Sequence, residues 1–390
     1  MSSDAPRREV LFVTGSRAEY DILFPVIEAV AASETLAPAI AVTGSHLAPQ
    51  FGLTVREVEA DGFPIAGRIE NLLASDSAGA RVKSAAIQLS GLVDLVQNRA
   101  PDFLIVVGDR EESITTALTG AYMNVPVVHI AGGDTADDFN VDNAVRHAVT
   151  KLAHLHMAAS PGSAARIVKL GEEDWRVHHV GAPGLDRLRK EPLLTREELG
   201  REMGVALDGP FAILIQHPIL PEMDQAGAQM RATLEAMAGL GIPVFISAPN
   251  SDAGNQAVRE AISDYAARHD QFHAYHNLQR RFFVNLMRHA GVLAGNSSSG
   301  IIEAPFLGLP VVNVGSRQRG REHGGNVTFT GYEVSEISAA LKQAVFDEAY
   351  RAKVKAAANP YGDGHAGEKI AAVMARETDK VRLLSKRNTF

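Results

Sequence analysis

The chain alternates short apolar segments with longer segments of helical periodicity, and this alternation restricts the fold more than any other feature of the sequence. The pattern predicts the α/β class, with mainly parallel sheets covered by helices. Because an open α/β sheet binds its ligand beyond the carboxyl ends of its strands, we expect the functional residues where the apolar segments end. The predicted strands lie in EVLFVTGS, APAIAVTGS, DFLIVVGD, VPVVHIAGG, LHMAAS, VHHVGAP, FAILIQHP, IPVFISAPN, FHAYHN, GVLAGNSSS and LPVVNVGS.

The length of 390 residues favours two domains, since one domain typically takes roughly 100–200 residues. We predict two doubly wound domains, 1–185 and 186–390, that face a central cleft. The break falls near 182–195, where a polar, proline-containing segment follows the first series of strands. The Ala-rich segment of about 364–385 is predicted to be a helix able to pack back on the first domain, and KRNTF at 386–390 to be a loose end.

Composition excludes several classes of function. The net charge is −8 and no long basic run occurs, so nucleic acid is not expected as a partner. No apolar stretch reaches the roughly 18 residues that span a bilayer, and the N-terminus lacks a signal-peptide pattern, so we expect a cytoplasmic protein without membrane contact. The chain has no cysteine, and its 14 histidines show no compact metal-binding spacing, so no metal site is expected.

The segment GVLAGNSSSGIIEAP, 291–305, has the pattern of a phosphate-binding turn between a strand and a helix. A helix N-terminus offers unpaired N–H groups and the positive end of the helix dipole, and both favour an anion. Glu303 would lie one turn further, where a carboxylate can bond a ribose diol. The alternative is a serine N-cap on an ordinary helix. The expected nucleotide-binding residues are Ser297, Ser298, Ser299, Gly300 and Glu303, with Gly295 in the turn.

The first predicted strands end in charged residues. Arg17 follows the first strand and could hold a phosphate, or it could be a solvated surface arginine. Asp109 and Arg110 follow DFLIVV, which places a carboxylate and a guanidinium together at the mouth of the sheet. Asp109 could transfer a proton there, or it could cap the helix that begins near Glu111.

A further group of candidates follows the strand in VPVVHIAGG. His129, Gly133 and Asp134 lie at its end, before a loop and a helical stretch, VDNAVRHAVTKLAH. On that helix Asp142 and Arg146 are four residues apart and share one face. They could form an ordinary i, i+4 ion pair, or they could bring an acid and a cation to the site of Asp109.

Two candidates follow strands of the second half. His217 comes after FAILI, where a neutral histidine can transfer a proton near pH 7 or bond a departing phosphate; a structural role is the alternative. Arg317 is the first of three arginines in GSRQRGR, 315–321, and at least one of the three is expected to face phosphate.

Taken together, these segments resemble the hydrolysing UDP-N-acetylglucosamine 2-epimerases that open sialic acid and legionaminic acid synthesis. The resemblance implies a GT-B-type fold of two Rossmann-like domains with the active site between them, in a homodimer or homotetramer. The matching segments, collinear over most of the chain, are GSRAEY (15–20), GDR (108–110), HIxGG (129–133), DNAVRHAVTKLAHLH (142–156), HHVGAPGLD (178–186), QHP (216–218) and GNSSSGIIEAPFLGLPVVNVGSRQRGRE (295–322).

The resemblance also implies a reaction on a UDP-sugar. UDP leaves C1 as the C2 proton is removed, and water adds to the resulting glycal to give the 2-epimer as a free sugar, with no cofactor and no obligatory metal. In this reaction Ser297, Ser298 and Glu303 would hold the nucleotide. Arg17, His217 and Arg317 would meet the diphosphate. Asp109 and Asp142 would be acid or base groups, positioned by Arg110 and Arg146.

One position departs from the family pattern. Many members carry a functional side chain, often a catalytic glutamate, where this chain has Ala131. Asp134, or Asp137 and Asp138 in the following loop, could supply the missing carboxylate. Otherwise the chain could act on a different sugar, such as a 2,4-diacetamido sugar, because the smaller side chain leaves room.

Three other functions stay open at this point. A non-hydrolysing 2-epimerase is disfavoured because QHPILPEMD follows the central histidine in place of an arginine-rich segment. A GT-B glycosyltransferase would turn over only with an acceptor present. A sensor of nucleotide sugars would bind the substrate without chemistry.

Overall fold

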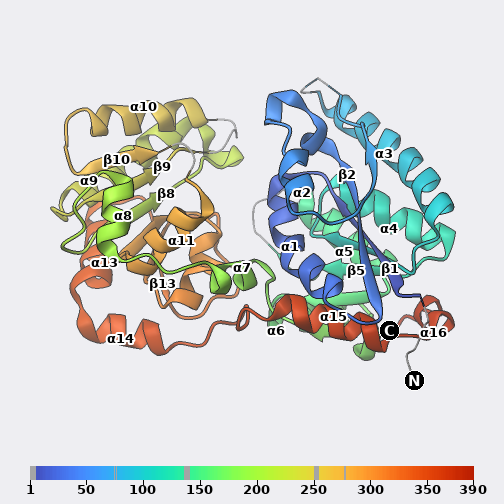
Figure 1. Ribbon diagram of the computed structural model, residues 1–390. Helices are drawn as coiled ribbons and strands as arrows, with labels where there is room; N and C mark the ends of the chain where they lie inside the picture. The colour runs from blue at the N-terminus through green and yellow to red at the C-terminus, as the bar shows by residue number, and fades with distance from the viewer. Residues whose placement is uncertain (1–5, 74, 76, 136–140, 250–253, 276–277) are drawn as a thin grey trace. The chain divides into compact units, whose positions relative to one another are not determined.

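In the computed structural model the described residues are 6–73, 75, 77–135, 141–249, 254–275 and 278–390. They form two α/β units (Figure 1). Unit 1 holds the described residues up to 135 together with 141–187 and 361–390, and unit 2 holds those from 188 to 360. Each unit has one parallel sheet, so the predicted α/β class with two doubly wound domains is confirmed.

The sheet of unit 1 has seven parallel strands in the order β3-β2-β1-β4-β5-β6-β7. The strand order reverses between β1 and β4, which is where a doubly wound sheet opens its ligand site. The strands are β1 (Arg8–Thr14), β2 (Leu36–Thr43), β3 (Ile65–Ile69), β4 (Phe103–Val107), β5 (Val127–Ile130), β6 (Leu155–Ala158) and β7 (Val177–His179).

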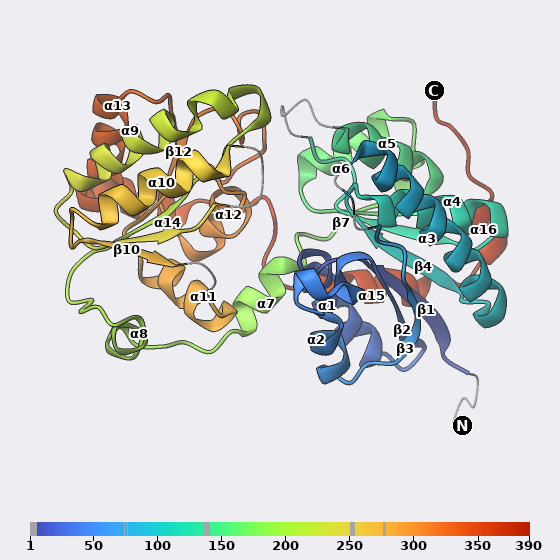
Figure 2. The same cartoon turned by 90° about the horizontal axis from the view of Figure 1, so that it is seen from above.

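Helices cover both faces of this sheet (Figure 2). Helices α1 (Arg17–Ala31) and α15 (Ala366–Arg376) pack on one face, in the apolar core that holds Phe12 and Ile370. Helices α3 (Ala78–Arg99), α4 (Glu111–Met123) and α5 (Asp142–Leu152) pack on the other face, in the core that holds Leu92 and Val149. The smaller helices α2 (Val55–Ala60) and α6 (Pro161–Lys169) also belong to unit 1, and α7 (Gly184–Lys190) crosses the boundary at which the chain leaves unit 1, after Arg187.

The C-terminal segment differs from its prediction in two ways. The expected helix of about 364–385 is two helices, α15 and α16 (Lys380–Leu384), separated by residues 377–379. The segment 386–390 was expected to be loose, yet the Thr389 N–H donates to the Gly171 carbonyl at 3.1 Å, and the Phe390 ring occupies the space beside Gly171. The end of the chain is therefore part of unit 1.

The sheet of unit 2 has six parallel strands in the order β10-β9-β8-β11-β12-β13, and the order reverses between β8 and β11. The strands are β8 (Ala212–Ile215), β9 (Val244–Ser247), β10 (Phe272–Tyr275), β11 (Val292–Gly295), β12 (Val311–Val314) and β13 (Val327–Thr330). The helices are α8 (Arg196–Met203), α9 (Ala226–Ala238), α10 (Asn255–Ala266), α11 (Arg280–His289), α12 (Ser299–Ile302), α13 (Val334–Phe346) and α14 (Glu348–Ala356). Among the described residues, no helix is long and apolar enough to span a bilayer.

Candidate functional site

A cavity of about 780 Å³ lies at the carboxyl ends of the strands of unit 1. Its lining comes from the segments that follow β1, β2, β3 and β4, from the N-terminal parts of α3 and α4, and from the first residue of α5. It includes Ser16, Arg110, Glu112 and Asp142. These loops flank the reversal of strand order between β1 and β4, where a ligand site is expected. The cavity thus combines hydroxyl, guanidinium and carboxylate groups, which suit a polar substrate such as a sugar.

Asp109 and Arg146 form an ion pair in unit 1. Gly108, at φ +70°, turns the chain after β4 and brings Asp109 to the end of the strand. Arg146 also donates to the Asp134 carbonyl at 2.9 Å and to Asn143 Oδ1 at 3.0 Å. The structure therefore brings together three of the residues predicted from separate segments. The alternative of Asp109 as a helix cap is wrong, because Arg110 is the N-cap of α4 and no side chain caps that helix.

His129 is fully buried, so the prediction that it binds substrate directly is corrected. Its Nε2 lies 2.8 Å from the Gly108 carbonyl, and its Nδ1 lies 3.3 Å from the Thr150 hydroxyl. Burial lowers the pKa of His129 to about 3, so the ring is neutral. A neutral ring between these two partners joins the turn that precedes Asp109 to helix α5, which is a positioning role.

The turn after β5 contains two residues in the left-handed region, Ala131 at φ +59° and Gly133. Gly133 has φ +74°, and a Cβ there would lie 2.3 Å from the Ser163 carbonyl oxygen, while Arg166 donates to the Gly133 carbonyl. Gly133 therefore shapes the turn. Asp134 is half-buried and its Oδ1 accepts from the Thr135 N–H at 3.0 Å. Asp137 and Asp138, the other proposed substitutes for a carboxylate at position 131, lie outside the described residues.

Arg17 is the first residue of α1 and pairs with Glu57 at 3.3 Å, with both side chains about half exposed. It is not among the residues that line the cavity of unit 1. Ser16 is the N-cap of α1, and its hydroxyl accepts from the Glu19 N–H at 3.4 Å. The solvated-arginine alternative for Arg17 is thus the arrangement observed, while Ser16 and Arg110 face the cavity in its place.

Two carboxylates beside Gly15, that of the buried Glu19 and that of the half-buried Glu112, were not among the predicted residues. Glu19 Oε2 accepts from the Gly15 N–H at 2.8 Å, and a Cβ on Gly15 would lie 1.9 Å from Glu112 Oε1. Burial, and then the charge of Glu112, raise the pKa of Glu19 to about 8, while burial also raises the pKa of Glu112. The sequence could have indicated both residues, because Glu19 in GSRAEY and Glu112 in GDREE each lie about one helical turn beyond the end of a predicted strand.

In unit 2, Asn296 links the loops that carry the predicted nucleotide-binding residues. The His217 N–H donates to Asn296 Oδ1 at 2.8 Å, and Asn296 Nδ2 donates to the His217 carbonyl at 2.8 Å. Arg317 Nη1 donates to the Asn296 carbonyl at 3.1 Å. Asn296 is buried and was missed from the sequence, because only the structure shows that three strand ends meet on it.

The serine-rich turn itself differs in detail from its prediction. Helix α12 has only four residues, so the expected helix dipole is small and an anion would depend on the loop N–H groups and hydroxyls. Ser298 occupies the N-cap without a capping hydrogen bond, so the plain N-cap alternative is not observed there. Ser297 Oγ accepts from the Ser299 N–H at 3.3 Å, and Glu303 is half-buried at the end of α12.

The two glycines of this turn provide close packing. Gly295 has φ +109°, and a Cβ there would lie 2.1 Å from the Ile215 carbonyl oxygen. Gly300 is buried, and a Cβ there would lie 2.9 Å from Val311, so the glycine lets α12 pack closely on β12.

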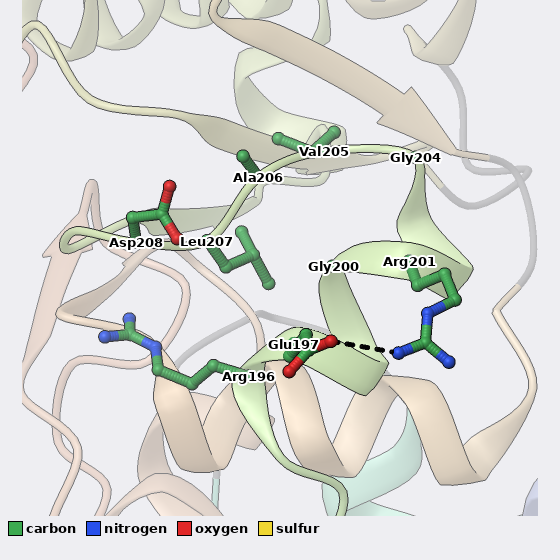
Figure 3. A pocket seen from close by; sticks show the side chains of 9 residues that line it. All are labelled: Arg196, Glu197, Gly200, Arg201, Gly204, Val205, Ala206, Leu207 and Asp208. Atoms are coloured by element: carbon green, nitrogen blue, oxygen red, sulfur yellow. Dashed lines mark hydrogen bonds and ion pairs between the residues drawn. The ribbon is translucent and has the colours of Figure 1, made fainter.

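A second cavity, of about 760 Å³, lies in unit 2 around α8 (Figure 3). It is lined by Arg196, Glu197, Arg201, Leu207 and Asp208, among others, and includes the exposed ion pair of Glu197 with Arg201. It contains none of the predicted site residues and lies away from the strand ends that carry them. We therefore place no part of the candidate active site there. Among the described residues, no cluster of three or more potential metal ligands occurs.

Two α/β units, each with one parallel sheet and polar side chains at its strand ends, place the chain in the GT-B-type class of α/β proteins. Residues 28–375 match the sequence profile of the UDP-N-acetylglucosamine 2-epimerases, and the chain belongs to this family. A hydrolysing UDP-N,N'-diacetylbacillosamine 2-epimerase of Legionella pneumophila is 34% identical over 383 residues, covering 98% of this chain and 100% of the relative. A UDP-N-acetylglucosamine 2-epimerase of Neisseria meningitidis is 31% identical over 340 residues, covering 86% of this chain and 87% of that protein.

The fold is shared with solved structures. The crystal structure of UDP-GlcNAc 2-epimerase from Neisseria meningitidis bound to UDP-GlcNAc superimposes with a TM-score of 0.79 at 21% identity, covering 95% of this chain and 100% of that chain. The S. aureus MnaA–UDP structure superimposes with a TM-score of 0.78 at 20% identity, covering 98% and 100%. These structures support the GT-B-type fold class that the sequence predicts.

Proposed function

We propose that this enzyme is a hydrolysing 2-epimerase of a UDP-2-acetamido sugar. The observation that carries the proposal is the group of Asp109, Arg146 and Asp134 at the strand ends of unit 1, beside the cavity lined by Asp142 and Arg110. Such a group can remove a proton from carbon and stabilise the charge that develops, because a fixed guanidinium holds the carboxylate in place. The name of the Legionella relative supports hydrolysis.

In the proposed reaction a carboxylate of unit 1 takes the proton from C2 of the sugar. The C1–O bond breaks, and its electron pair leaves with UDP, which gives a glycal. Water then adds its oxygen to C1, and a proton adds to C2 from the opposite face. Asp109, Asp134 and Asp142 are the candidates for these proton transfers. His217 and Arg317, held on Asn296, would bond the departing diphosphate, and Ser297, Ser298, Ser299 and Glu303 would bind the nucleoside.

Two sugars are the candidate substrates. The relatives act, by their names, on UDP-N-acetylglucosamine or on UDP-N,N'-diacetylbacillosamine. Alanine at position 131 leaves more room than the glutamate of many family members, and the 34% identity over nearly the full length is to a diacetylbacillosamine enzyme. We therefore propose the 2,4-diacetamido sugar as the preferred substrate. The homo-oligomer and the cytoplasmic location stay predictions.

The test is incubation with each UDP-sugar in deuterated water, followed by NMR of the products. We expect free UDP, the free 2-epimer and deuterium at C2, with higher kcat/KM for the diacetamido substrate. A product that keeps UDP would indicate a non-hydrolysing 2-epimerase. Transfer of the sugar only with an added acceptor would indicate a glycosyltransferase, and binding without any product would indicate a sensor.

A further inference from the structure

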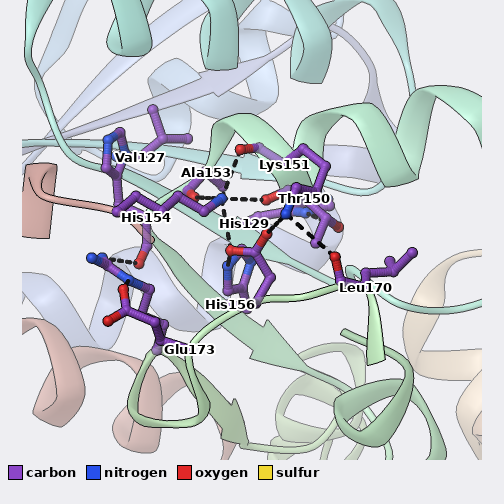
Figure 4. Close-up of polar contacts among 12 residues, drawn as sticks. Val127, His129, Thr150, Lys151, Ala153, His154, His156, Leu170 and Glu173 are labelled. Atoms are coloured by element: carbon purple, nitrogen blue, oxygen red, sulfur yellow. Dashed lines mark hydrogen bonds and ion pairs between the residues drawn. The ribbon is translucent and has the colours of Figure 1, made fainter. Parts of the chain in front are cut away.

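Lys386 lies just after the end of helix α16 (Lys380–Leu384) and places its ammonium group at the C-terminal end of helix α5. Its Nζ donates to three main-chain carbonyls, those of Thr150 at 3.0 Å, Lys151 at 2.7 Å and Ala153 at 2.7 Å. These three acceptors lie together in Figure 4. The last carbonyls of a helix lack partners within the helix and carry its negative dipole end. A half-buried ammonium group at this point therefore provides partners for the last carbonyls of α5.

The charge of Lys386 is balanced by one buried carboxylate. Glu172 is fully buried, and its oxygens lie 2.7 Å from Lys386 Nζ, 2.7 Å from Lys151 Nζ and 3.0 Å from His156 Nε2. Burial raises the pKa of Glu172, but hydrogen bonds from His156, Lys151 and Lys386 outweigh it and lower the pKa to about 2. The carboxylate is therefore ionised across the working range of pH.

A second cation, which is fully buried, holds the segment that carries Lys386. Arg176 is fully buried and donates to the carbonyls of Leu383 at 2.7 Å, Arg382 at 3.2 Å and Ser385 at 3.2 Å. It also donates to the His154 carbonyl at 3.1 Å, just after α5. Arg176 thus fixes the end of α16 next to the end of α5, and Lys386 follows directly.

Helix α5 carries residues of the candidate active site. It begins with Asp142, and Arg146 one turn later pairs with Asp109. Near its C-terminal end, Thr150 contacts His129, which contacts the Gly108 carbonyl. An isolated helix of 11 residues is marginal in water, so its placement depends on what holds its ends and its apolar face.

We propose that Lys386 is a positioning residue of the enzyme, which holds the C-terminal end of α5 and so fixes Asp142 and Arg146 against Asp109. The proposal rests on the proposed function for its kinetic readout, but its structural readout is independent of that function. Lys386 lies on the opposite end of α5 from Asp142, so it acts through the helix and not on the substrate.

The test compares three variants. Lys386→Met removes the ammonium and keeps most of the side-chain length, and Lys386→Arg restores a cation. Lys380→Met, at an exposed lysine at the start of α16, is the matched control. We expect Lys386→Met to lower kcat on the order of tenfold to hundredfold with KM changed less than about twofold, since small displacements of catalytic groups cost this much. We expect Lys386→Arg to recover most of the loss and Lys380→Met to match the wild type.

Amide hydrogen exchange gives the readout that needs no activity. We expect faster exchange in residues 142–152 of Lys386→Met than of Lys380→Met at equal global stability, and unchanged exchange there would overturn the proposal. Wild-type kcat in a folded Lys386→Met would overturn it as well. If the wild type releases no UDP, the proposed function fails, and the exchange experiment still decides the role of Lys386.

If Lys386→Met does not fold, the pH profiles of the wild type and of Lys386→Arg test the role of Lys386. Burial lowers the pKa of Lys386 to about 8 against the opposing effect of Glu172. The other groups around it are Arg176, Lys151, and the histidines His154 and His156, whose pKa values burial lowers to about 4. We expect kcat to fall above about pH 8 in the wild type and this decline to move to higher pH in Lys386→Arg. Superimposable profiles would contradict the role of Lys386.

Discussion

Asp109, at the end of β4, and Arg146, in the middle of α5, form an ion pair whose side chains are only 19% and 12% exposed. The guanidinium of Arg146 also donates to the Asp134 carbonyl after β5 and to Asn143 on its own helix. One planar side chain thus joins two strand ends to a helix. A lysine cannot reproduce this arrangement, because an ammonium group lacks the fixed fork of donors.

Arg146→Lys is therefore expected to lower kcat on the order of a hundredfold while the fold is kept. The measurement is the initial rate of UDP release, with circular dichroism to establish folding. The matched control is Arg68→Lys, at an exposed arginine that pairs with Glu59 at 2.7 Å. An exposed pair of this kind contributes about 0–1 kcal/mol, so the control should keep wild-type rates. Equal rates for the two variants would refute the role of Arg146.

The buried carboxyl group of Glu19 predicts a dependence of stability on pH. Burial and the charge of Glu112 raise its pKa from 4.5 to about 8 in the folded protein. The folded state therefore holds this proton more tightly than the unfolded state, and the stability of the wild type falls as pH rises from about 4.5 to 8. Gln at position 19 can accept from the Gly15 N–H and does not titrate.

Accordingly, the Tm of Glu19→Gln relative to the wild type should rise between pH 5 and pH 8.5. Thermal melts at the two pH values measure this difference. Glu34→Gln, at an exposed glutamate, is the control and should show no such change. A difference in Tm that stays constant with pH would show that Glu19 is ionised throughout this range.

The reciprocal hydrogen bonds between Asn296 and the backbone of His217 predict a coupled loss of binding and stability. Asn296→Ala removes both hydrogen bonds at a buried position, so the N–H and the carbonyl of His217 lose their Asn296 partner. Each lost bond is expected to lower the free energy of unfolding by about 1–3 kcal/mol. Because Arg317 also rests on the Asn296 carbonyl, we expect weaker UDP binding, measured by calorimetry. Asn98→Ala, at an exposed asparagine, should leave both quantities unchanged. Wild-type UDP affinity in Asn296→Ala would separate this residue from the nucleotide site.

The sequence patterns predicted every buried strand of the two sheets, because a strand covered on both faces is a short apolar run. Two strands were missed, β3 and β13, and both lie at a sheet edge. In β3 the sequence IAGRI contains a glycine and an arginine, and all five residues are at least partly exposed. Edge strands need less apolar sequence, so a search for apolar runs passes over them.

The candidate site was predictable where charged residues follow directly after an apolar strand or lie on the next helix. Asp109, Asp134 and Arg146 belong to separate segments, and their meeting follows from the parallel order of β4 and β5. The buried residues that hold the site were not predictable in the same way. Lys386 lies 235 residues from its carbonyl partner in Lys151, and no local pattern in KRNTF indicates that contact. Likewise, no local pattern indicates that His129 is buried with its two ring nitrogens next to Thr150 and the Gly108 carbonyl.

Ala131 has a backbone conformation that disfavours β-branched side chains. Its φ is +59°, in the left-handed region that favours glycine, and its N–H donates to the Met157 carbonyl at 3.1 Å. For a residue with a Cβ this conformation costs roughly 1–2 kcal/mol, and for a β-branched residue it costs more. Ala131→Val is therefore expected to destabilise the protein by more than about 2 kcal/mol.

In contrast, Ala131→Gly should change the free energy of unfolding by less than about 1 kcal/mol. The relief of strain is offset by the extra freedom of glycine in the unfolded chain, which costs about 0.4–1 kcal/mol. Urea denaturation measures both variants. Ala66→Val, at a partly exposed alanine of β3, controls for the added methyl groups and should be nearly neutral. If Ala131→Val lowers the free energy of unfolding no more than Ala66→Val does, the turn after β5 can relax without cost. The backbone conformation would then not restrict the side chain at position 131.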